Sequence, residues 1–502
     1  MGIKREPADR PAAGSTSGDK VNRVSSASRR FASGQSKHAR RGLFVIGLAL
    51  LTGAVVFLLP LHGINPWAHR VIAIVATALV LWIGEGLDLA VTSLAVIALL
   101  AVFGPKTSSE STRDALYGFQ QTAGYFILST LIVATATVRS GLAARLARLL
   151  IAGARGSARR MYFELVLFMP PFAMVIPSAA TRNAILIPAY EHVYERYGVE
   201  RGDRTSKLIS LALGLLQMVA STAVLTGGVV PITASFLLGG MSWGEWFIYM
   251  AVPCYAIIFG AAIVLFLWQR PKLDDRAMPE PVEQGPESNA WSPAEVRAAI
   301  VISIMMVLWL SDFLTGWDPL IPALLGGVVL LAPGIGVISW KEFESSSPWT
   351  LFLVTGSALS IAHAMEGSGA ASWVANALLG HVPLKTVPDP ILLLTLLLVI
   401  VPVSVLLPNR SGALGILIPL LTSISNGIGI NPIPIGLMAT IVVQTTTFYA
   451  MQNASTLLVY HTRHFAPFDL LRAGLITFGI SLLVIMVIAF PWWSLVGLPL
   501  RP

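Results

Sequence analysis

The sequence predicts an all-α polytopic membrane protein, with about 11 transmembrane helices plus two re-entrant hairpins arranged in two inverted repeats. Its 502 residues are 55% apolar and only 12% charged, whereas globular proteins average about 25% charged residues. Apolar runs long enough to cross a bilayer recur along most of the chain. Two stretches, SAATRNAILIPAY (178–190) and NRSGALGILIPLL (409–421), each place one arginine and small polar residues before the string ILIP. These related stretches indicate the repeat.

The N-terminal segment 1–41 is a basic tail without periodic apolar residues. It holds ten of the 34 Lys and Arg residues and three of the 26 acidic residues, so the remaining chain is almost neutral. This composition predicts a disordered tail. The positive-inside rule places the tail in the cytoplasm. We expect the protein to lie in the cell (inner) membrane. No aromatic or folded module accompanies the charge, so nucleic acid is not an expected partner.

The first half, 42–269, is expected to contain about six crossings and one hairpin. Simple crossings are predicted at 43–60, 68–84, 88–103, 117–138 and 245–269. The arginine-rich amphipathic segment 139–160 is expected on the cytoplasmic surface. Segment 161–190 is interrupted by prolines and has charged segments on both sides, which predicts a re-entrant hairpin. The run 208–238 is too long for one plain helix and contains two adjacent glycines, so we expect a broken crossing.

The second half, 296–502, follows a polar segment, 270–295, that is predicted to be a cytoplasmic linker. Its simple crossings are predicted at 297–314, 319–333, 348–367 and 470–492. A second hairpin is expected at 390–425 and a second broken crossing at 432–460. After the first helix, each half makes about five crossings, an odd number, so the second half is predicted to be inverted. Inverted repeats with broken helices are typical of secondary transporters, which bind their substrate between the repeats.

The two hairpin tips carry residues suited to anion binding. A helix that begins inside the membrane presents unpaired N–H groups and a positive dipole end, and both attract anions. Arg182 and Arg410 add planar donor forks for oxyanions, and charges at membrane depth are often functional. The other tip residues predicted to bind the substrate are Ser178, Thr181, Asn183, Asn409 and Ser411. The structural alternatives are an ion pair between Arg182 and Glu164, and simple capping of the helices by the hydroxyls.

The broken crossings supply the remaining predicted substrate contacts. In the first, Gly228 allows the backbone itself to approach a ligand. In the second, Asn453 and Thr456 lie in the uncharged polar run TTTFYAMQNAST, at 445–456, and follow the expected break. Ordinary hydrogen bonding between helices is the alternative explanation for this run.

The chain lacks the sequence signals of a catalytic or metal-dependent protein. It has no phosphate-binding Gly-Lys motif and no evident nucleophile–base set, so neither an enzyme nor a nucleotide-driven pump is predicted. His461 and His464 lie in a short predicted loop without further ligands nearby, so no metal site is expected there. No cofactor is predicted.

Several stretches resemble the divalent anion:sodium symporters, the carriers of dicarboxylates, citrate and sulfate. The matching stretches are LVLWIGEGLDLAVTSLAVIALLAVFG (79–104), GFQQTAGYFILSTLIVATATVRSGLAARLA (118–147), MSWGEWFIYMAVPCYAIIFGAAIVLFLW (241–268) and PWTLFLVTGSALSIAHAMEGSGAASWVA (348–375). The resemblance implies 11 helices with two hairpins, a homodimer, and an elevator movement of a transport domain against a scaffold.

The resemblance also implies sodium and substrate sites at the tips and breaks, where the family carries Ser-Asn-Thr and Thr-Pro-Pro-Asn motifs. The tip positions here are 178–180 (SAA) and 409–411 (NRS), which keep only Ser178 and one later hydroxyl. The break positions, 229–232 and 453–456, keep a single proline between them. The family-type sodium sites are therefore predicted to be degraded, which argues against sodium coupling of the family type.

These observations predict a secondary carrier of small divalent anions, such as dicarboxylates or sulfate, in which the arginines replace the charge of bound cations. Anion exchange, proton coupling or uniport are then favoured. The alternatives are a sodium-coupled symporter of the same anions, an anion-permeable channel, and an anion-binding membrane sensor. A sensor needs a folded output domain, for which 1–41 and 270–295 are too short and polar. The expected partners are a small dianion, the lipid bilayer and a second copy of the chain.

Overall fold

The computed structural model of the chain is built from helices. It describes residues 40–105, 108–153, 157–270, 290–346, 348–380 and 386–501. These residues contain no strand, and nine of their helices are long and apolar enough to cross a membrane. The all-α polytopic class is thereby confirmed. Nearly all of the predicted tail and most of the predicted linker lie outside the described residues.

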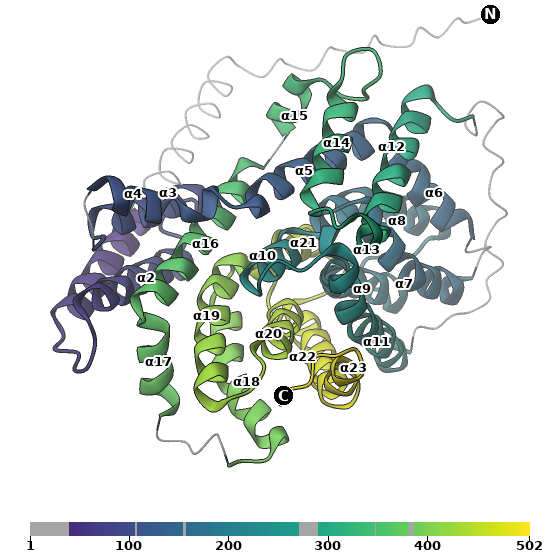
Figure 1. Cartoon of the computed structure of the whole chain (residues 1–502). Helices are drawn as coiled ribbons and strands as arrows, with labels where there is room; N and C mark the ends of the chain where they lie inside the picture. Colours follow the sequence, from purple (N-terminus) through teal and green to yellow (C-terminus); the bar gives the residue numbers. More distant parts are fainter. Residues whose placement is uncertain are drawn as a thin grey trace, which may run out of the picture.

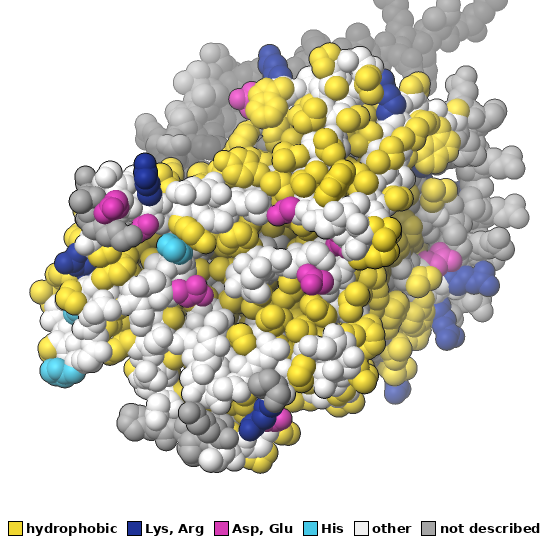
Figure 2. Space-filling model, viewed as in Figure 1, with side chains coloured by type: hydrophobic (Ala, Val, Ile, Leu, Met, Phe, Trp, Pro, Cys, Tyr) yellow, Lys and Arg dark blue, Asp and Glu magenta, His cyan; other side chains and the backbone are white. Residues whose placement is uncertain are grey.

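The outer helices expose a large apolar surface. Figure 2 shows hydrophobic side chains gathered over α12 (Pro293–Leu310) and α14 (Leu320–Leu331). Ile304 of α12 and Val328 of α14 are 55% and 65% exposed. Apolar patches of this extent are rare on soluble monomers, whereas a lipid bilayer solvates them without cost.

The two halves of the chain run through the same order of elements. A helix at Arg40–Leu58 comes first. The first half then contains α2 (Pro66–Gly84), α3 (Leu89–Val102), α4 (Ser108–Ala115), η1 (Tyr117–Phe119), α5 (Thr122–Arg139), α6 (Leu142–Gly153), α7 (Ala158–Val175), α8 (Ala179–Tyr197), α9 (Arg204–Thr222), η2 (Leu225–Gly227), α10 (Val229–Leu237) and α11 (Trp243–Gln269). The second half contains α12, α13 (Asp312–Thr315), α14, α15 (Trp340–Ser346), α16 (Trp349–Ser368), α17 (Ala370–Leu379), α18 (Asp389–Leu406), α19 (Arg410–Ile428), α20 (Pro432–Thr445), η4 (Ala450–Gln452), α21 (Ala454–Tyr460), α22 (Pro467–Val484), η5 (Ile485–Ala489) and α23 (Phe490–Leu495).

Local sequence supports this correspondence. Both α2 and α12 begin with a capping residue followed by proline, at 65–66 and 292–293. Proline suits the first position of a helix, where its missing N–H would be unpaired anyway. Each helix then carries a Leu-Trp pair at the same distance from its cap, at 81–82 and 308–309. The recurring order agrees with the predicted repeat, while its inverted orientation remains a prediction.

The two hairpins, α7–α8 and α18–α19, turn at proline. Pro177 and Pro408 each follow a residue with extended backbone, since a residue before proline avoids the helical conformation. Three further prolines that the sequence suggested as breaks, at 170, 171 and 402, lie inside helices. The first hairpin also runs to Tyr197, past its predicted end at 190.

The two broken crossings lie at the centre of the fold. α9 stops at Thr222 and α10 starts at Val229, while α20 stops at Thr445 and α21 starts at Ala454. Both breaks occur where the sequence predicts them. The helices α9 and α20 pack together, with the first hairpin against α9 and the second against α20 (Figure 1). The hairpins also reach across the halves, because α8 packs against α21 and α19 packs against α10.

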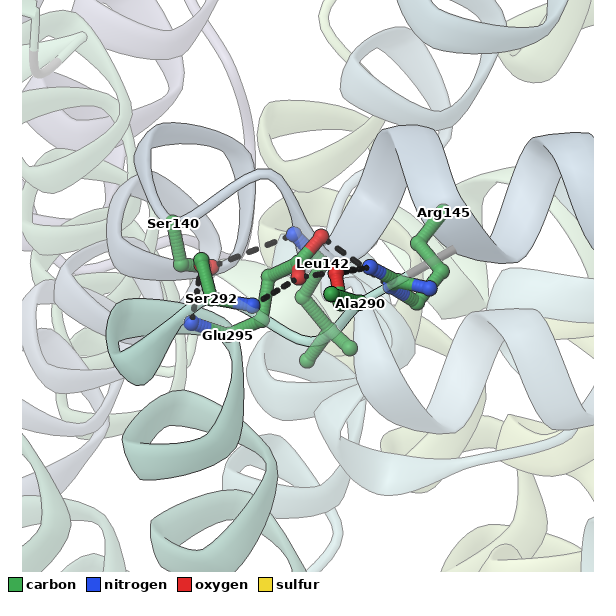
Figure 3. Close-up of polar contacts among 6 residues, drawn as sticks. All are labelled: Ser140, Leu142, Arg145, Ala290, Ser292 and Glu295. Atoms are coloured by element: carbon green, nitrogen blue, oxygen red, sulfur yellow. Dashed lines mark hydrogen bonds and ion pairs between the residues drawn. The ribbon is translucent and has the colours of Figure 1, made fainter. Parts of the chain in front are cut away.

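The connecting helix α6, for which a location on the cytoplasmic surface remains a prediction, is attached to the second half of the chain through one of its arginines. Arg145 is buried, and its Nε and one terminal nitrogen donate hydrogen bonds to the two carboxylate oxygens of Glu295, at 3.1 and 2.9 Å (Figure 3). A further nitrogen–oxygen contact of 2.6 Å joins Arg145 to the Ala290 carbonyl. The Arg145–Glu295 ion pair attaches α6 to the first turn of α12. α6 itself begins directly after the turn at Gly141, whose φ is +87°. The corresponding turn before α17 has Gly369 at φ +77°.

Candidate functional site

The first hairpin tip is a short non-helical turn between α7 and α8. Ser178 is the N-cap of α8, and its Oγ accepts a hydrogen bond from the Thr181 backbone N–H at 3.2 Å. This is the capping role expected of a hydroxyl at a helix start. Both side chains are half-buried.

Arg182 is fully buried and connects this tip to α9, the first part of the first broken crossing, through hydrogen bonds. Its Nε donates to Gln217 Oε1 at 2.8 Å, and one terminal nitrogen donates to the Ile176 carbonyl at 2.5 Å. The other terminal nitrogen donates to the Gln217 carbonyl at 3.0 Å and to Ser221 Oγ at 2.5 Å. All these acceptors are neutral oxygen atoms, and Glu164 is not among them. Because each guanidinium nitrogen already bonds to the protein, Arg182 has little capacity left for a substrate.

Asn183 and Thr456 are brought together as contacts between the two halves. Asn183 Nδ2 donates to Ser455 Oγ and to the Leu213 carbonyl, each at 2.9 Å. Thr456 Oγ1 donates to the Gly214 carbonyl at 2.6 Å. Both side chains are fully buried, so these bonds hold α8, α9 and α21 to one another.

The second hairpin tip keeps donors unpaired. Asn409 is the N-cap of α19, and its Oδ1 accepts a hydrogen bond from the Gly412 N–H at 3.0 Å. The Asn409 Nδ2 is buried without a hydrogen-bond partner, and so is Nε1 of Trp82 on α2. The Trp82 ring is a neighbour of this tip, because a Cβ atom at Gly412 would lie 3.1 Å from it. Trp82 was not predicted for the site, since nothing distinguishes it within an apolar helix.

Arg410 differs from Arg182 in how its donors are used. It is 5% exposed, and one terminal nitrogen donates to Thr447 Oγ1 at 2.8 Å. Its Nε and its other terminal nitrogen are buried without a partner. The Nε hydrogen points along the edge shared with the nitrogen that bonds to Thr447, while the other terminal nitrogen lies on the Cδ side, so the two unpaired nitrogen atoms donate in different directions. Ser411, the next residue, lies 3.5 Å from Thr233 of α10 through its hydroxyl.

The breaks contribute one further unpaired donor. Asn453 is the N-cap of α21, with its Oδ1 accepting from the Thr456 N–H at 2.7 Å and its Nδ2 buried without a partner. Gln452 Nε2 donates to the Val405 carbonyl at 3.3 Å, which holds this break against the end of α18. Gly228 begins α10 in an extended conformation and offers only its backbone.

A cavity of about 560 Å³ reaches this side of the site. Its lining includes Arg41, Glu85, Asp88, Pro408, Met451 and Asn453. Asn453 thus faces the cavity directly, while Pro408 adjoins Asn409 in the chain. The break that carries Asn453 therefore borders space that solvent and a small ligand can enter, and the second tip begins one residue after Pro408.

The charge of the two arginines has no acidic counterpart. The ion pairs of the described residues join Arg145 to Glu295, Lys207 to Asp469, His464 to Glu191 and Arg501 to Asp389. Arg182 and Arg410 therefore add two buried positive charges without a bonded carboxylate. A buried charge is costly unless it is paired, and a bound anion would relieve that cost. Within the described part of the chain, no group of three His, Cys, Asp or Glu side chains is placed to hold a metal ion.

These features define a class of protein: a helical membrane protein with two hairpins and two broken helices meeting at its centre, as in secondary transporters. The chain belongs to the family described as the sodium:sulfate symporter transmembrane region, whose model matches residues 42–498. The resemblance seen in the sequence is thereby confirmed, and the protein is a membrane transporter of this family.

Three relatives illustrate the family. A "Membrane protein" of Cupriavidus necator is 27% identical over 68% of this chain and 70% of its own length. An "Uncharacterized transporter" of Haemophilus influenzae is 22% identical over 89% of this chain and 97% of its own. The L-tartrate/succinate antiporter of Shigella dysenteriae is 25% identical over 65% of this chain and 72% of its own.

Proposed function

We propose that this protein is an elevator-type secondary carrier that exchanges small divalent anions, such as dicarboxylates or sulfate, across the membrane. The observation that carries the proposal is the buried guanidinium of Arg410, whose Nε and one terminal nitrogen are unpaired. Asn409 and Asn453 add one unpaired amide each. Four nitrogen donors of this kind suit a carboxylate or sulfate group.

The charge balance favours exchange over sodium symport. Arg182 and Arg410 together give the centre of the protein two positive charges with no bonded acid. A dianion neutralises both charges, so the loaded centre crosses the membrane at low electrostatic cost. The empty centre would carry two uncompensated charges through a low-dielectric layer, which is strongly unfavourable. Such a carrier returns only with another dianion bound.

The family also supports a second candidate. Its description names sodium:sulfate symport, which favours sodium coupling, whereas the name of the Shigella relative describes an antiporter of tartrate and succinate. The motifs at 178–180 and 409–411 are degraded, and an arginine lies in or near each of them. Both features favour exchange, as in the antiporter, over sodium symport.

The elevator movement is proposed from the connecting helices. Each is preceded by a Ser-Gly turn with positive φ, at 140–141 and 368–369. Each turn is tied to the first helix of the opposite half: Arg145 binds Glu295 of α12, and Asn65, the cap of α2, donates from Nδ2 to the Ser368 carbonyl at 2.6 Å. Fixed turns at both ends allow the hairpins and broken helices to move together. We further propose a homodimer in the inner membrane, with a cytoplasmic N-terminus.

Counterflow in proteoliposomes tests the exchange. Vesicles are loaded with one unlabelled dianion (sulfate, succinate, tartrate or citrate), and uptake of the labelled anion is measured with and without sodium. We expect uptake that requires an internal dianion and is unchanged when potassium or choline replaces sodium. Uptake into empty vesicles that requires a sodium gradient would establish the symporter instead.

A further inference from the structure

A second group of buried polar side chains lies away from the anion site, near the non-tip end of the first hairpin. Four polar atoms there are buried without a hydrogen-bond partner: Glu164 Oε2 of α7, the hydroxyls of Tyr190 and Tyr194 of α8, and Nδ1 of His464 in the loop after α21. The tyrosines and the histidine are at most 3% exposed. Buried polar atoms without partners are rare in proteins, so four in one region require a physical explanation.

These side chains form a continuous row. The rings of Tyr190 and Tyr194 lie 6.4 Å apart, and the rings of Tyr194 and His464 lie 5.0 Å apart. Glu164 lies near Tyr190, on the adjoining helix α7. At the other end, His464 Nε2 lies 2.6 Å from Glu191 Oε1, and the Glu191 side chain is 28% exposed. The row therefore runs from a solvent-exposed carboxylate to a carboxylate inside the hairpin.

The hydrogen bond to the Glu191 carboxylate determines which tautomer the neutral His464 ring adopts. A carboxylate oxygen only accepts, so Nε2 of His464 carries the hydrogen and Nδ1 of the neutral ring is a free acceptor. A proton from solvent near Glu191 can add to Nδ1, forming one N–H bond and giving the ring a positive charge opposite the Glu191 carboxylate. The two phenol groups both donate and accept, so they can connect Nδ1 to Glu164 through ordered water.

We propose that Glu164, Tyr190, Tyr194, His464 and Glu191 form a proton-binding cluster that makes transport depend on pH. His464 and Glu191 join the loop after α21 to the first hairpin, so their protonation alters a contact between the two halves. The effect on transport rests on the proposed function, whereas proton binding itself does not.

The charged groups on the neighbouring helices have partners elsewhere or are exposed. Asp203, at the start of α9, caps that helix through the Thr205 N–H, and Lys207 of α9 pairs with Asp469 of α22. From α6, Arg145 is bound to Glu295 and Arg148 is exposed. The uncharged Ser210 of α9 also lies near Tyr194.

Proton binding can be measured directly on the purified protein. The chain has eight histidines, and ¹⁵N-histidine NMR from about pH 5.5 to about pH 8.5 records each ring that is visible. The signal lost in His464→Gln is assigned to His464. We expect this signal to titrate, to shift its midpoint in Glu164→Gln and Tyr194→Phe, and to be unchanged in His461→Gln, an exposed histidine of the same loop. A His464 signal that is constant over this range overturns the proposal.

The transport effect has a separate test. Sulfate remains a dianion throughout this pH range, so a change in sulfate counterflow with pH reports on the protein. We expect the rate to change about threefold or more between about pH 6 and about pH 8 in the wild type and in His461→Gln, and less than about twofold in His464→Gln. Equal pH profiles in all three proteins would exclude the coupling to transport. If sulfate is not carried at all, the proposed function fails, while the NMR result still decides on the proton site.

Discussion

The two hairpin tips carry nearly the same sequence pattern and use it differently. Each has a proline, a capping residue and one arginine ahead of the string ILIP. At the first tip, Arg182 bonds through all three nitrogen atoms to neutral protein oxygens. At the second, Arg410 bonds through one nitrogen only and leaves Nε and one terminal nitrogen unpaired. The comparison shows that the acceptors around a buried arginine, more than its position in a motif, decide whether it stabilises the fold or binds a ligand.

The difference originates in the broken helices. Opposite Arg182, α9 presents three acceptors: the side-chain oxygen and the carbonyl of Gln217, and the hydroxyl of Ser221. The close approach of the break is possible because residue 227 is glycine: a Cβ atom there would lie 2.2 Å from the Ser221 carbonyl oxygen. Opposite Arg410, the second break offers the single hydroxyl of Thr447.

The largest expected effect is on stability, at the first tip. Arg182→Ala removes at least four hydrogen bonds and leaves buried acceptors and a cavity. We expect a loss of about 3 kcal/mol or more in the free energy of unfolding, seen as a lower melting temperature in detergent. Arg501→Ala, at an exposed arginine, is the control and should melt like the wild type. An Arg182→Ala protein that melts at the wild-type temperature would contradict the structural role of Arg182.

The second expected effect is on anion affinity, at the second tip. Arg410→Gln removes the charge-assisted hydrogen bonding to the ligand, worth about 1.5 to 3 kcal/mol, so the dissociation constant should rise roughly 10- to 100-fold. The melting temperature of the unliganded protein should stay the same or rise, because a buried, incompletely paired charge is removed. Half-saturating anion concentrations from counterflow measure the effect. A melting temperature that falls as far as in Arg182→Ala would assign Arg410 a structural role.

The amide donors should contribute less. Asn409→Ser and Asn453→Ser each keep an oxygen that can cap the helix and remove the unpaired Nδ2. One neutral hydrogen bond is worth about 0.5 to 1.5 kcal/mol, so affinity should fall roughly 2- to 10-fold in each variant. Unchanged affinity in both variants would restrict the site to Arg410.

The smallest effect is expected at the first cap. Ser178→Ala removes one capping bond at 3.2 Å, which is worth about 1 kcal/mol of stability. Anion affinity should remain within about twofold of the wild type, because the first tip is assigned a structural role. A larger loss of affinity than in Asn409→Ser would show that both tips contact the substrate.

Much of this architecture could be predicted from the sequence. The hairpins, both breaks and the apolar crossings follow from proline, glycine and hydropathy, which act locally along the chain. The start of α19 at Arg410 and the end of α20 at Thr445 agree with the predicted tip and break.

The partners of the arginines could not be predicted in the same way. Gln217 lies 35 residues from Arg182, and Thr447 lies 37 residues from Arg410, so only the folded arrangement shows which donors are satisfied. The sequence suggested an ion pair between Glu164 and Arg182, whereas the acceptors of Arg182 in the structure are neutral oxygen atoms. Trp82 lacked any sequence signal, because its role depends on α2 passing beside the second tip.

A structure with bound substrate tests the central claim most directly. The protein would be imaged by electron cryomicroscopy in sodium-free buffer with a saturating dianion from the counterflow screen. We predict density for the anion within hydrogen-bond distance of Arg410 Nε or of its unpaired terminal nitrogen, with Arg182 still bonded to Gln217 and Ser221. An anion bound to Arg182, or a bound anion that does not touch Arg410, would contradict the account.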